Sequence, residues 1–250
     1  MSQHLLSFNS WLHRHLLLPL ITGLLLLIVL HLTQVDLILA QWLFHQEGNA
    51  PGWSLRHNYF LEHILHNGGR HLVTLLSLTL LVTLTLSFFK PSLKPWRKDL
   101  LLLLANVAIS ILLVRFGKEY TNVSCPWDVI QFGGSKPWIP FPNSLFSSMD
   151  LGQCFPGGHS SGAFAWVALY YFALPHMPTR RFKFLSFAII LGSAFAVCQE
   201  LRGAHFLTHD LTSLLLCWVV ATLGYGIVYR PWCQRQSATI DLPNAASMRV

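Results

Sequence analysis

The residues LLLPLITGLLLLIVLHLTQVDLILA, Leu16–Ala40, indicate a membrane protein. Asp36 is the only Asp, Glu, Lys or Arg among them. The stretch exceeds the roughly 20 apolar residues that a transmembrane helix needs. It is also too long for the apolar part of a cleaved signal peptide, and no small-residue cleavage site follows it. We therefore expect it to remain in the chain as a first membrane span.

Further apolar segments follow along the chain. Of the 250 residues, 53% are hydrophobic and 11% are charged, whereas a soluble domain carries about 25% charged residues. The composition and segments predict an all-α fold, a polytopic membrane helix bundle of about six transmembrane helices. One segment, Gly162–Leu174, is short, so we expect it to extend back through His159 or to be buried by its neighbours. The further segments are His71–Phe89, Leu100–Phe116, Gly162–Leu174, Phe184–Val197 and Leu211–Tyr229.

Basic residues concentrate in alternate loops, which predicts the orientation of the bundle. The net charge of +7 is explained by cytoplasmic loops, so we expect the bilayer and no nucleic acid as a partner. The positive-inside rule places both termini in the cytoplasm and the intervening loops outside. The basic residues are Lys90, Lys94, Arg97 and Lys98 after the second segment, Arg180, Arg181 and Lys183 after the fourth, and Arg230, Arg235 and Arg249 in the tail.

Two prolines in the first basic loop suggest how the chain is divided. Pro91 and Pro95 interrupt the helical pattern between the second and third segments. We expect residues 1–95 to form an N-terminal pair of membrane helices with an outer loop. Residues 96–235 would form a four-helix core with the active site, and residues 236–250 a cytoplasmic tail.

Three polar clusters fall on the predicted outer side. Ionisable residues at membrane depth are costly, so three such clusters on one face indicate a functional site. Two of them flank a long loop, 117–161, that is rich in Trp, Pro, Gly and Phe. The clusters are Arg115 and Lys118 with Cys125-Pro126-Trp127-Asp128, then Cys154–Gly162, then Gln199–Asp210.

The residue types in these clusters suit phosphoryl transfer, which depends on positioning and on cations around the phosphate oxygens. Lys118 and Arg202 supply positive charge, the arginine in a bidentate manner. Gly157 and Gly158 allow backbone N–H groups to approach an anion closely. Of two histidines in the clusters, one can attack phosphorus as a neutral imidazole and the other can protonate the leaving oxygen.

The order and spacing of these residues resemble the type 2 phosphatidic acid phosphatase superfamily, which includes bacterial acid phosphatases and vanadium haloperoxidases. Its motifs read Lys-x6-Arg-Pro, Pro-Ser-Gly-His and Ser-Arg-x5-His-x3-Asp. Lys118 stands seven residues before Cys125-Pro126, which matches the first motif, and Pro156-Gly157-Gly158-His159 matches the second. Arg202 and His205 match the third motif. The resemblance covers residues 96–230.

The resemblance implies a role for each matched residue. His205 corresponds to the nucleophile that becomes phosphohistidine. His159 corresponds to the acid that protonates the leaving group and later activates water. Lys118 corresponds to a phosphate clamp, and Gly158 to a residue whose backbone N–H faces the phosphate. The resemblance implies no cofactor.

Two departures from the motifs remove positive charge. Cys125 replaces the motif-one arginine, and Gln199 occupies the usual arginine position of motif three. Arg202 lies three residues before the nucleophile, so on a helix it would reach the same phosphate. Arg115 lies one turn from Lys118 and is the second candidate to supply the missing charge.

A third departure concerns the orientation of the nucleophile. His209 stands where the family has the aspartate that orients the imidazole. Asp210 is the next residue, but one residue turns a side chain about 100° around a helix. We therefore assign the orienting role to His209, which accepts a hydrogen bond from His205 as the suitable neutral tautomer.

Two cysteines near the motifs leave two states open. Cys125 and Cys154 both lie on the predicted outer side. If that side is the bacterial periplasm, oxidation is permitted, and a disulfide would tie motif one to motif two. The alternative is a pair of free thiols packed near the site.

Metal binding is the rival use of the histidines. His205, His209 and His159 with Asp210 make a plausible zinc set. Zinc would leave the cations Lys118 and Arg202 without a purpose, so we expect no metal. The remaining histidines near the second segment, His63, His66 and His71, are expected as interface residues that can contact a lipid headgroup.

The stretch Arg202-Gly203-Ala204-His205-Phe206 resembles one in bacterial lipid A phosphatases. This resemblance favours an active enzyme. With the predicted orientation, we expect a multi-pass enzyme of the bacterial inner membrane with a periplasmic active site. Hydrolysis of a phosphate monoester or diphosphate on a phospholipid, a polyprenyl phosphate or lipid A is expected. One alternative is a phosphotransferase that moves phosphate from polyprenyl diphosphate to a lipid. Another, suggested by the missing arginine and aspartate, is a non-catalytic lipid binder or transporter.

Overall fold

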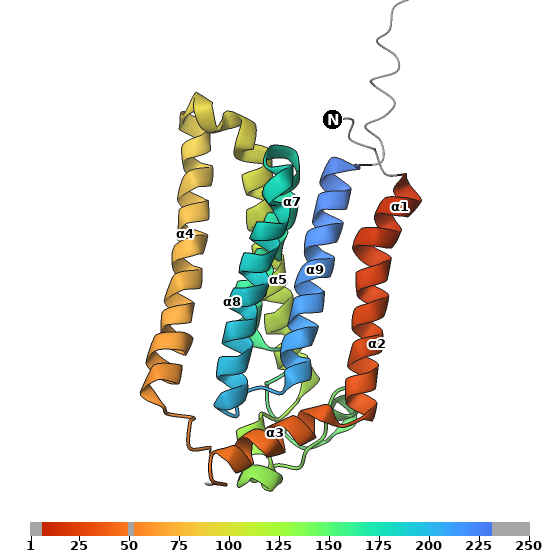
Figure 1. Cartoon of the computed structure of the whole chain (residues 1–250), viewed down its shortest axis with the longest axis vertical. Helices are drawn as coiled ribbons and strands as arrows, with labels where there is room; N and C mark the ends of the chain where they lie inside the picture. Colours follow the sequence, from red (N-terminus) through yellow and green to blue (C-terminus); the bar gives the residue numbers. More distant parts are fainter. Residues whose placement is uncertain (1–6, 50–52, 232–250) are drawn as a thin grey trace, which may run out of the picture.

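A computed structural model describes residues 7–49 and 53–231, which fold as a bundle of helices (Figure 1). Turns of π- and 3₁₀-helix extend several of these helices, including a π-helical turn at Phe60–Asn67 before α4. The α-helices are α1 Phe8–Leu12, α2 Leu18–Leu32, α3 Val35–Gln46, α4 Gly68–Phe89, α5 Arg97–Thr121, α6 Gly158–Phe164, α7 Leu169–His176, α8 Arg181–Leu201 and α9 Leu207–Tyr229.

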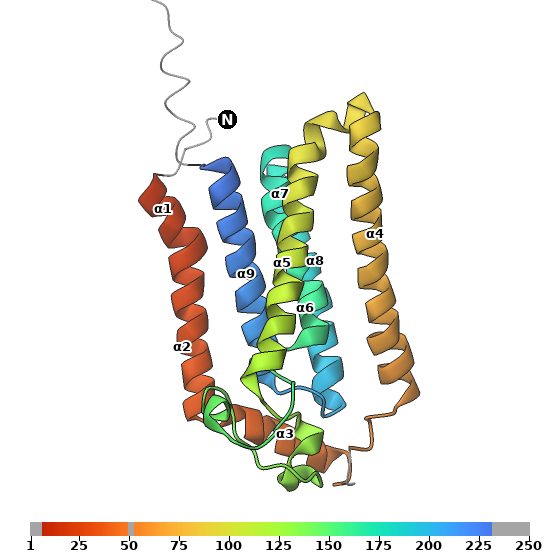
Figure 2. The ribbon, with the colours of Figure 1, turned by 180° about the vertical axis from the view of Figure 1, so that it is seen from behind.

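Within the described ranges, five helical segments are long and apolar enough to cross a membrane. The predicted third and fifth segments are longer at both ends in the structure, and the second and sixth begin earlier but end at the predicted residue. Polar residues near the helix ends continue the helix beyond the apolar run. The segments lie side by side, with α4 and α2 on opposite flanks (Figure 1 and Figure 2). They are Phe8–Leu32, Phe60–Phe89, Pro91–Thr121, Pro178–Leu201 and Leu207–Tyr229.

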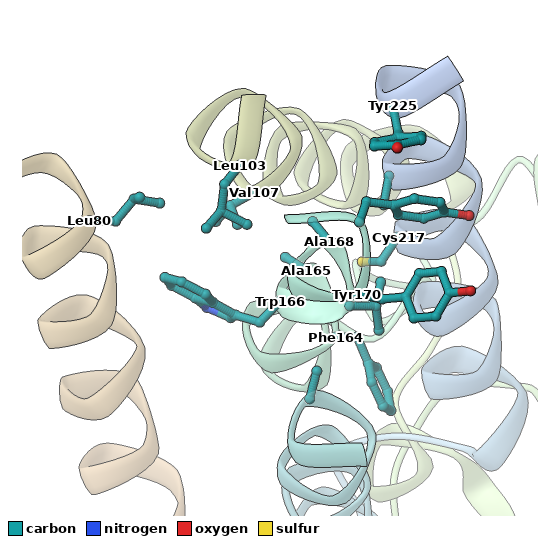
Figure 3. Packing of buried hydrophobic residues seen from close by; sticks show 14 of the residues in the cluster. Leu80, Leu103, Val107, Phe164, Ala165, Trp166, Ala168, Tyr170, Cys217 and Tyr225 are labelled. Carbon is teal, nitrogen blue, oxygen red and sulfur yellow. The ribbon is translucent and has the colours of Figure 1, made fainter. Parts of the chain in front are cut away.

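The predicted short fourth segment is the buried centre of the bundle. It starts at Gly158 and runs through α6, a 3₁₀ turn at Ala165–Ala168 and α7. Its residues from Ala163 to Ala168 are at most 4% exposed. Trp166 points toward Leu80 of α4, while Tyr170 lies on the side of α9 (Figure 3). The neighbouring helices thus bury this segment, and the prediction of an all-α membrane bundle of about six helices is confirmed.

The predicted end of the first span is wrong. The helix ends at Leu32, and Gln34 adopts a left-handed conformation with φ 54°. The chain then turns into α3, which lies across one end of the bundle (Figure 1). A span that continued to Ala40 would carry Asp36 unpaired within the membrane. The turn instead lets the Asp36 carboxylate accept hydrogen bonds from Thr208, from its N–H at 2.9 Å and from its hydroxyl.

Asp36, on α3, therefore accepts a hydrogen bond from a backbone N–H in the first turn of α9. Burial raises the pKa of the Asp36 carboxyl above its ordinary value, and the hydrogen bonds from Thr208 only partly oppose this shift. We expect Asp36→Ala to lower the free energy of unfolding by about 1–2 kcal/mol, because it leaves the Thr208 N–H unpaired. Asp36→Asn should lose less at neutral pH, since the amide oxygen still accepts and no charge is buried. Thermal unfolding of both variants in detergent tests this, and equal losses would contradict it.

The two ends of the bundle differ in chemistry. The residues of the predicted site lie at the end that carries α3 and the long loop, near the last turn of α5 and the first of α9 (Figure 2). The basic loops that hold Lys94, Arg180 and Arg230 lie at the other end. The predicted tail, 236–250, lies outside the described residues, as do residues 1–6.

Candidate active site

A polar cavity of about 470 Å³ lies at the end of the bundle that carries α3. Three membrane-spanning helical segments, the turn between α8 and α9, the start of α6 and the long loop contribute to its walls. Most of the predicted site residues line it, together with residues that sequence reasoning had not assigned to the site. The lining residues are His66, Arg70, Lys118, Cys125, Trp127, Cys154, Gly158, His159, Gln199, Arg202, Ala204 and His205.

His205 is held by Asp210. Its Nδ1 lies 3.0 Å from Asp210 Oδ1, and the two side chains are 8% and 2% exposed. The chain around His205 is a loop, and α9 begins only at Leu207. The two residues therefore do not share a helix, and the expected 100° rotation between positions does not apply. The bond leaves Nε2 as the ring nitrogen free for chemistry on the cavity side.

The surroundings of Asp210 keep it in place. The Ser160 hydroxyl, from the first turn of α6, donates a hydrogen bond to the same Oδ1. Gly157 packs directly behind this pair, and a Cβ there would lie 2.1 Å from Asp210 Oδ1 and 2.9 Å from His205 Nδ1. The Gly157 N–H donates to the His209 carbonyl at 2.9 Å. Gly157 therefore serves the packing of the His205–Asp210 pair, and its N–H does not face the cavity.

The structure does not give His209 the predicted orienting role. Its ring centroid lies 6.0 Å from that of His205. The ring is 3% exposed and packs edge-on against Phe155 at 5.4 Å and Phe206 at 5.3 Å. The side chain faces away from the cavity because it sits one position before Asp210 on α9. His209 is thus a buried residue behind the site.

His159 lies in the first turn of α6 and lines the cavity. Its ring stacks on Phe195 of α8, with centroids 4.6 Å apart, and lies 4.3 Å from the His66 ring. Among the described residues, the buried His159 Nε2 has no hydrogen-bond partner. The stacking fixes the ring, and its free nitrogen remains available to a ligand.

Lys118 and Arg202 bring positive charge to the cavity. The Lys118 ammonium, at the last turn of α5, donates to the Gln153 carbonyl at 2.8 Å. Gly158 makes room for that side chain, because a Cβ there would lie 2.6 Å from Lys118 Cε. Arg202 follows α8 and is 6% exposed. Its Nε donates to the Arg56 carbonyl at 2.9 Å and its Nη1 to Gln199 Oε1 at 3.2 Å.

The structure does not bring Arg115 into the cavity. Its Nε donates to Glu119 Oε1 at 2.9 Å, and its side chain is 72% exposed. Arg115 lies one turn before Lys118 on α5, but the ion pair holds its guanidinium on the outer surface of that helix. The prediction that Arg115 replaces the missing motif cation is not supported by this placement.

Sequence reasoning missed two cavity residues of the segment Phe60–Phe89. His66 was expected at the membrane interface, yet it is bonded to the Gln199 side chain within the site. Arg70 follows one helical turn later and also lines the cavity. By contrast, His63 and His71 are exposed. A repeat of polar residues every four positions, at Glu62, His66 and Arg70, was the available signal of a polar helix face.

A disulfide links the two cysteines of the motifs. Cys125 and Cys154 are bonded, with their Cα atoms 5.2 Å apart. The link joins the two ends of the long loop beside the cavity. The Trp127 N–H also donates to the Gly203 carbonyl at 2.9 Å, which fixes the loop to the turn that carries His205.

The side chains of the alternative zinc set do not converge. Within 7–49 and 53–231, no group of three His, Cys, Asp or Glu side chains is placed to hold a metal ion. His205 faces Asp210, while His209 is turned toward Phe155 and Phe206.

Comparison with known proteins supports the motif assignment. Residues 99–233 match the PAP2 superfamily. No curated protein and no solved structure matches the chain. The matched region contains Lys118, His159, Arg202, His205 and Asp210, which the fold gathers at one cavity. The chain is a multi-pass membrane protein that belongs to the PAP2 superfamily, a family of phosphatases.

Proposed function

We propose that this protein is a lipid phosphatase that works through a phosphohistidine on His205. One observation carries the proposal: His205 Nδ1 is bonded to the buried Asp210, and the ring borders a cavity that also contains Lys118 and Arg202. A carboxylate on one ring nitrogen selects the tautomer in which the other nitrogen has a free lone pair. Cations around it favour the approach of a phosphate.

In the proposed reaction, His205 Nε2 attacks phosphorus, an N–P bond forms, and the bond to the leaving oxygen breaks. His159 donates a proton to that oxygen. A water molecule then attacks the phosphohistidine, gives its proton to His159 and releases inorganic phosphate. Lys118 and Arg202 stabilise the equatorial oxygens in both steps, and the Gly158 backbone N–H faces them.

We propose an amphiphilic substrate, because the cavity opens at the end of membrane-spanning helices. The stretch from Arg202 to Phe206, which resembles that of bacterial lipid A phosphatases, favours a lipid phosphate. Basic loops at the opposite end favour a cytoplasmic location for that end and a periplasmic one for the site. The Cys125–Cys154 bond is consistent with an oxidising compartment. In the proposed division of the chain, residues 96–235 form the phosphatase core.

Purified protein in detergent, with EDTA present, is expected to release inorganic phosphate from at least one lipid phosphate. A suitable panel contains phosphatidic acid, phosphatidylglycerol phosphate, polyprenyl diphosphate and lipid A. Labelled polyprenyl diphosphate with an added lipid acceptor separates the two enzyme classes, since a phosphotransferase would label the acceptor. Binding of the lipids with no phosphate release or transfer would rule out both and favour a lipid binder.

A further inference from the structure

The cavity contains a cation that the family motifs do not account for. Arg70 lies on α4, outside the matched residues 99–233, and its side chain lines the same cavity as Lys118 and Arg202. The other two cations are engaged: Lys118 with the Gln153 carbonyl, and Arg202 with Gln199 and, at 3.7 Å, with Glu62.

The guanidinium of Arg70 is not engaged in this way. The main-chain carbonyl of Arg70 accepts a hydrogen bond from the Thr74 hydroxyl at 2.8 Å, a bond within the helix that leaves the side chain free. Over the described part of the chain, no hydrogen bond or ion pair involves its side chain, which is exposed at the cavity. The Arg70 guanidinium thus has five N–H groups that it can donate to an anion.

The packing of α4 explains why Arg70 reaches the site. Gly69 is buried against α8, and a Cβ there would lie 2.6 Å from the Phe195 ring. Phe195 is the residue that stacks on His159. The missing side chain at Gly69 therefore lets α4 approach α8 beside the catalytic candidate, and Arg70 is the next residue.

The helix face that precedes Arg70 already contacts the site. The π-helical turn Phe60–Asn67 carries Glu62, which pairs with Arg202, and His66, which bonds Gln199. Arg70 follows His66 by four residues, so it continues the same face. π-Helical turns are rare and occur frequently at functional sites. The π-helical turn Phe60–Asn67 and the start of α4 together present these polar side chains to the cavity.

We propose that Arg70 binds the substrate phosphate and supplies the charge that Cys125 removes from motif one. This inference rests on the proposed function of the site. An arginine at the cavity edge can bind two phosphate oxygens at once, which a lysine cannot do. Arg70 then makes the N-terminal helix pair part of the phosphate site.

The test compares Arg70→Gln with Arg115→Gln, which changes the arginine named from the sequence as the second candidate for this charge. Phosphate release gives kcat and KM, and titration with orthovanadate measures anion binding without turnover. Arg70→Gln is expected to lower kcat/KM about 10- to 100-fold and to weaken vanadate binding comparably, because a charge-assisted contact is lost. Arg70→Lys should restore part of both. Arg115→Gln should change neither by more than about twofold, since its side chain is solvated.

Each outcome decides the question. If Arg70→Gln leaves both measurements unchanged, or if both variants lose equally, the specific role of Arg70 is overturned. If the wild-type protein binds vanadate through Arg70 but releases no phosphate, the proposed function fails and the anion site stands. If the wild type neither binds vanadate nor releases phosphate, both are overturned.

Discussion

Replacing His205 with alanine is expected to lower kcat by roughly 10⁴-fold or more, because no other group can take over a covalent step at that position. Its Nδ1 is fixed at 3.0 Å from Asp210, so the opposite nitrogen is the one presented to phosphorus. His159, another imidazole at the cavity, is stacked on Phe195 and is assigned to proton transfer. The same substitution should abolish covalent labelling by a substrate with radioactive phosphate.

His63→Ala is the matched control, because His63 is an exposed histidine of the same end of the bundle and does not line the cavity. It should retain wild-type rate and labelling. Because His205 is buried, thermal unfolding and vanadate titration of His205→Ala are needed to show that the cavity remains intact. Turnover or phosphoenzyme that persists in a folded His205→Ala protein would remove His205 as the nucleophile.

Asp210→Asn is expected to lower kcat by about 10³- to 10⁴-fold with little change in substrate binding, as loss of the orienting carboxylate does in a catalytic triad. An amide can present its N–H to His205 Nδ1, which then becomes an acceptor, and Nε2 carries the proton. The nucleophilic lone pair is lost although the shape of the site is preserved. The amide nitrogen then also faces Ser160, whose hydroxyl oxygen can accept its second N–H.

His209→Gln provides the comparison for Asp210→Asn. The His209 ring packs on Phe155 and Phe206 and is not bonded to His205. We expect a loss of less than about tenfold in kcat, with a lowered melting temperature, because a buried ring contact is removed. Steady-state kinetics on both proteins measure the difference. If His209→Gln has the larger effect on kcat, the orienting role returns to His209.

The contrast between Asp210 and His209 shows where sequence reasoning stops. Residue types and spacing were sufficient to find Lys118, His159 and His205. The choice between neighbouring positions required the start of α9 at Leu207, which leaves His205 on a loop. Helical periodicity applies only within a helix, so it argued against Asp210, the neighbour that the structure bonds to His205.

The composition and the long apolar segments predicted a membrane protein, because a helix that crosses the bilayer needs an apolar sequence of a set length whatever its neighbours are. The break at Gln34 and the path of α3 did not follow, since apolar residues continue through both. Arg70 was hidden for another reason. Its approach to the cavity depends on the contact between Gly69 and Phe195, which are far apart in the sequence.

All cavity residues lie at the end of the bundle that carries α3, where α5 ends and α6 begins. For the proposed enzyme, this means that only one leaflet of the bilayer supplies substrate. A lipid phosphate whose headgroup faces the other leaflet is out of reach, whatever its affinity. Such a lipid must be flipped to the other leaflet before the proposed enzyme can hydrolyse it.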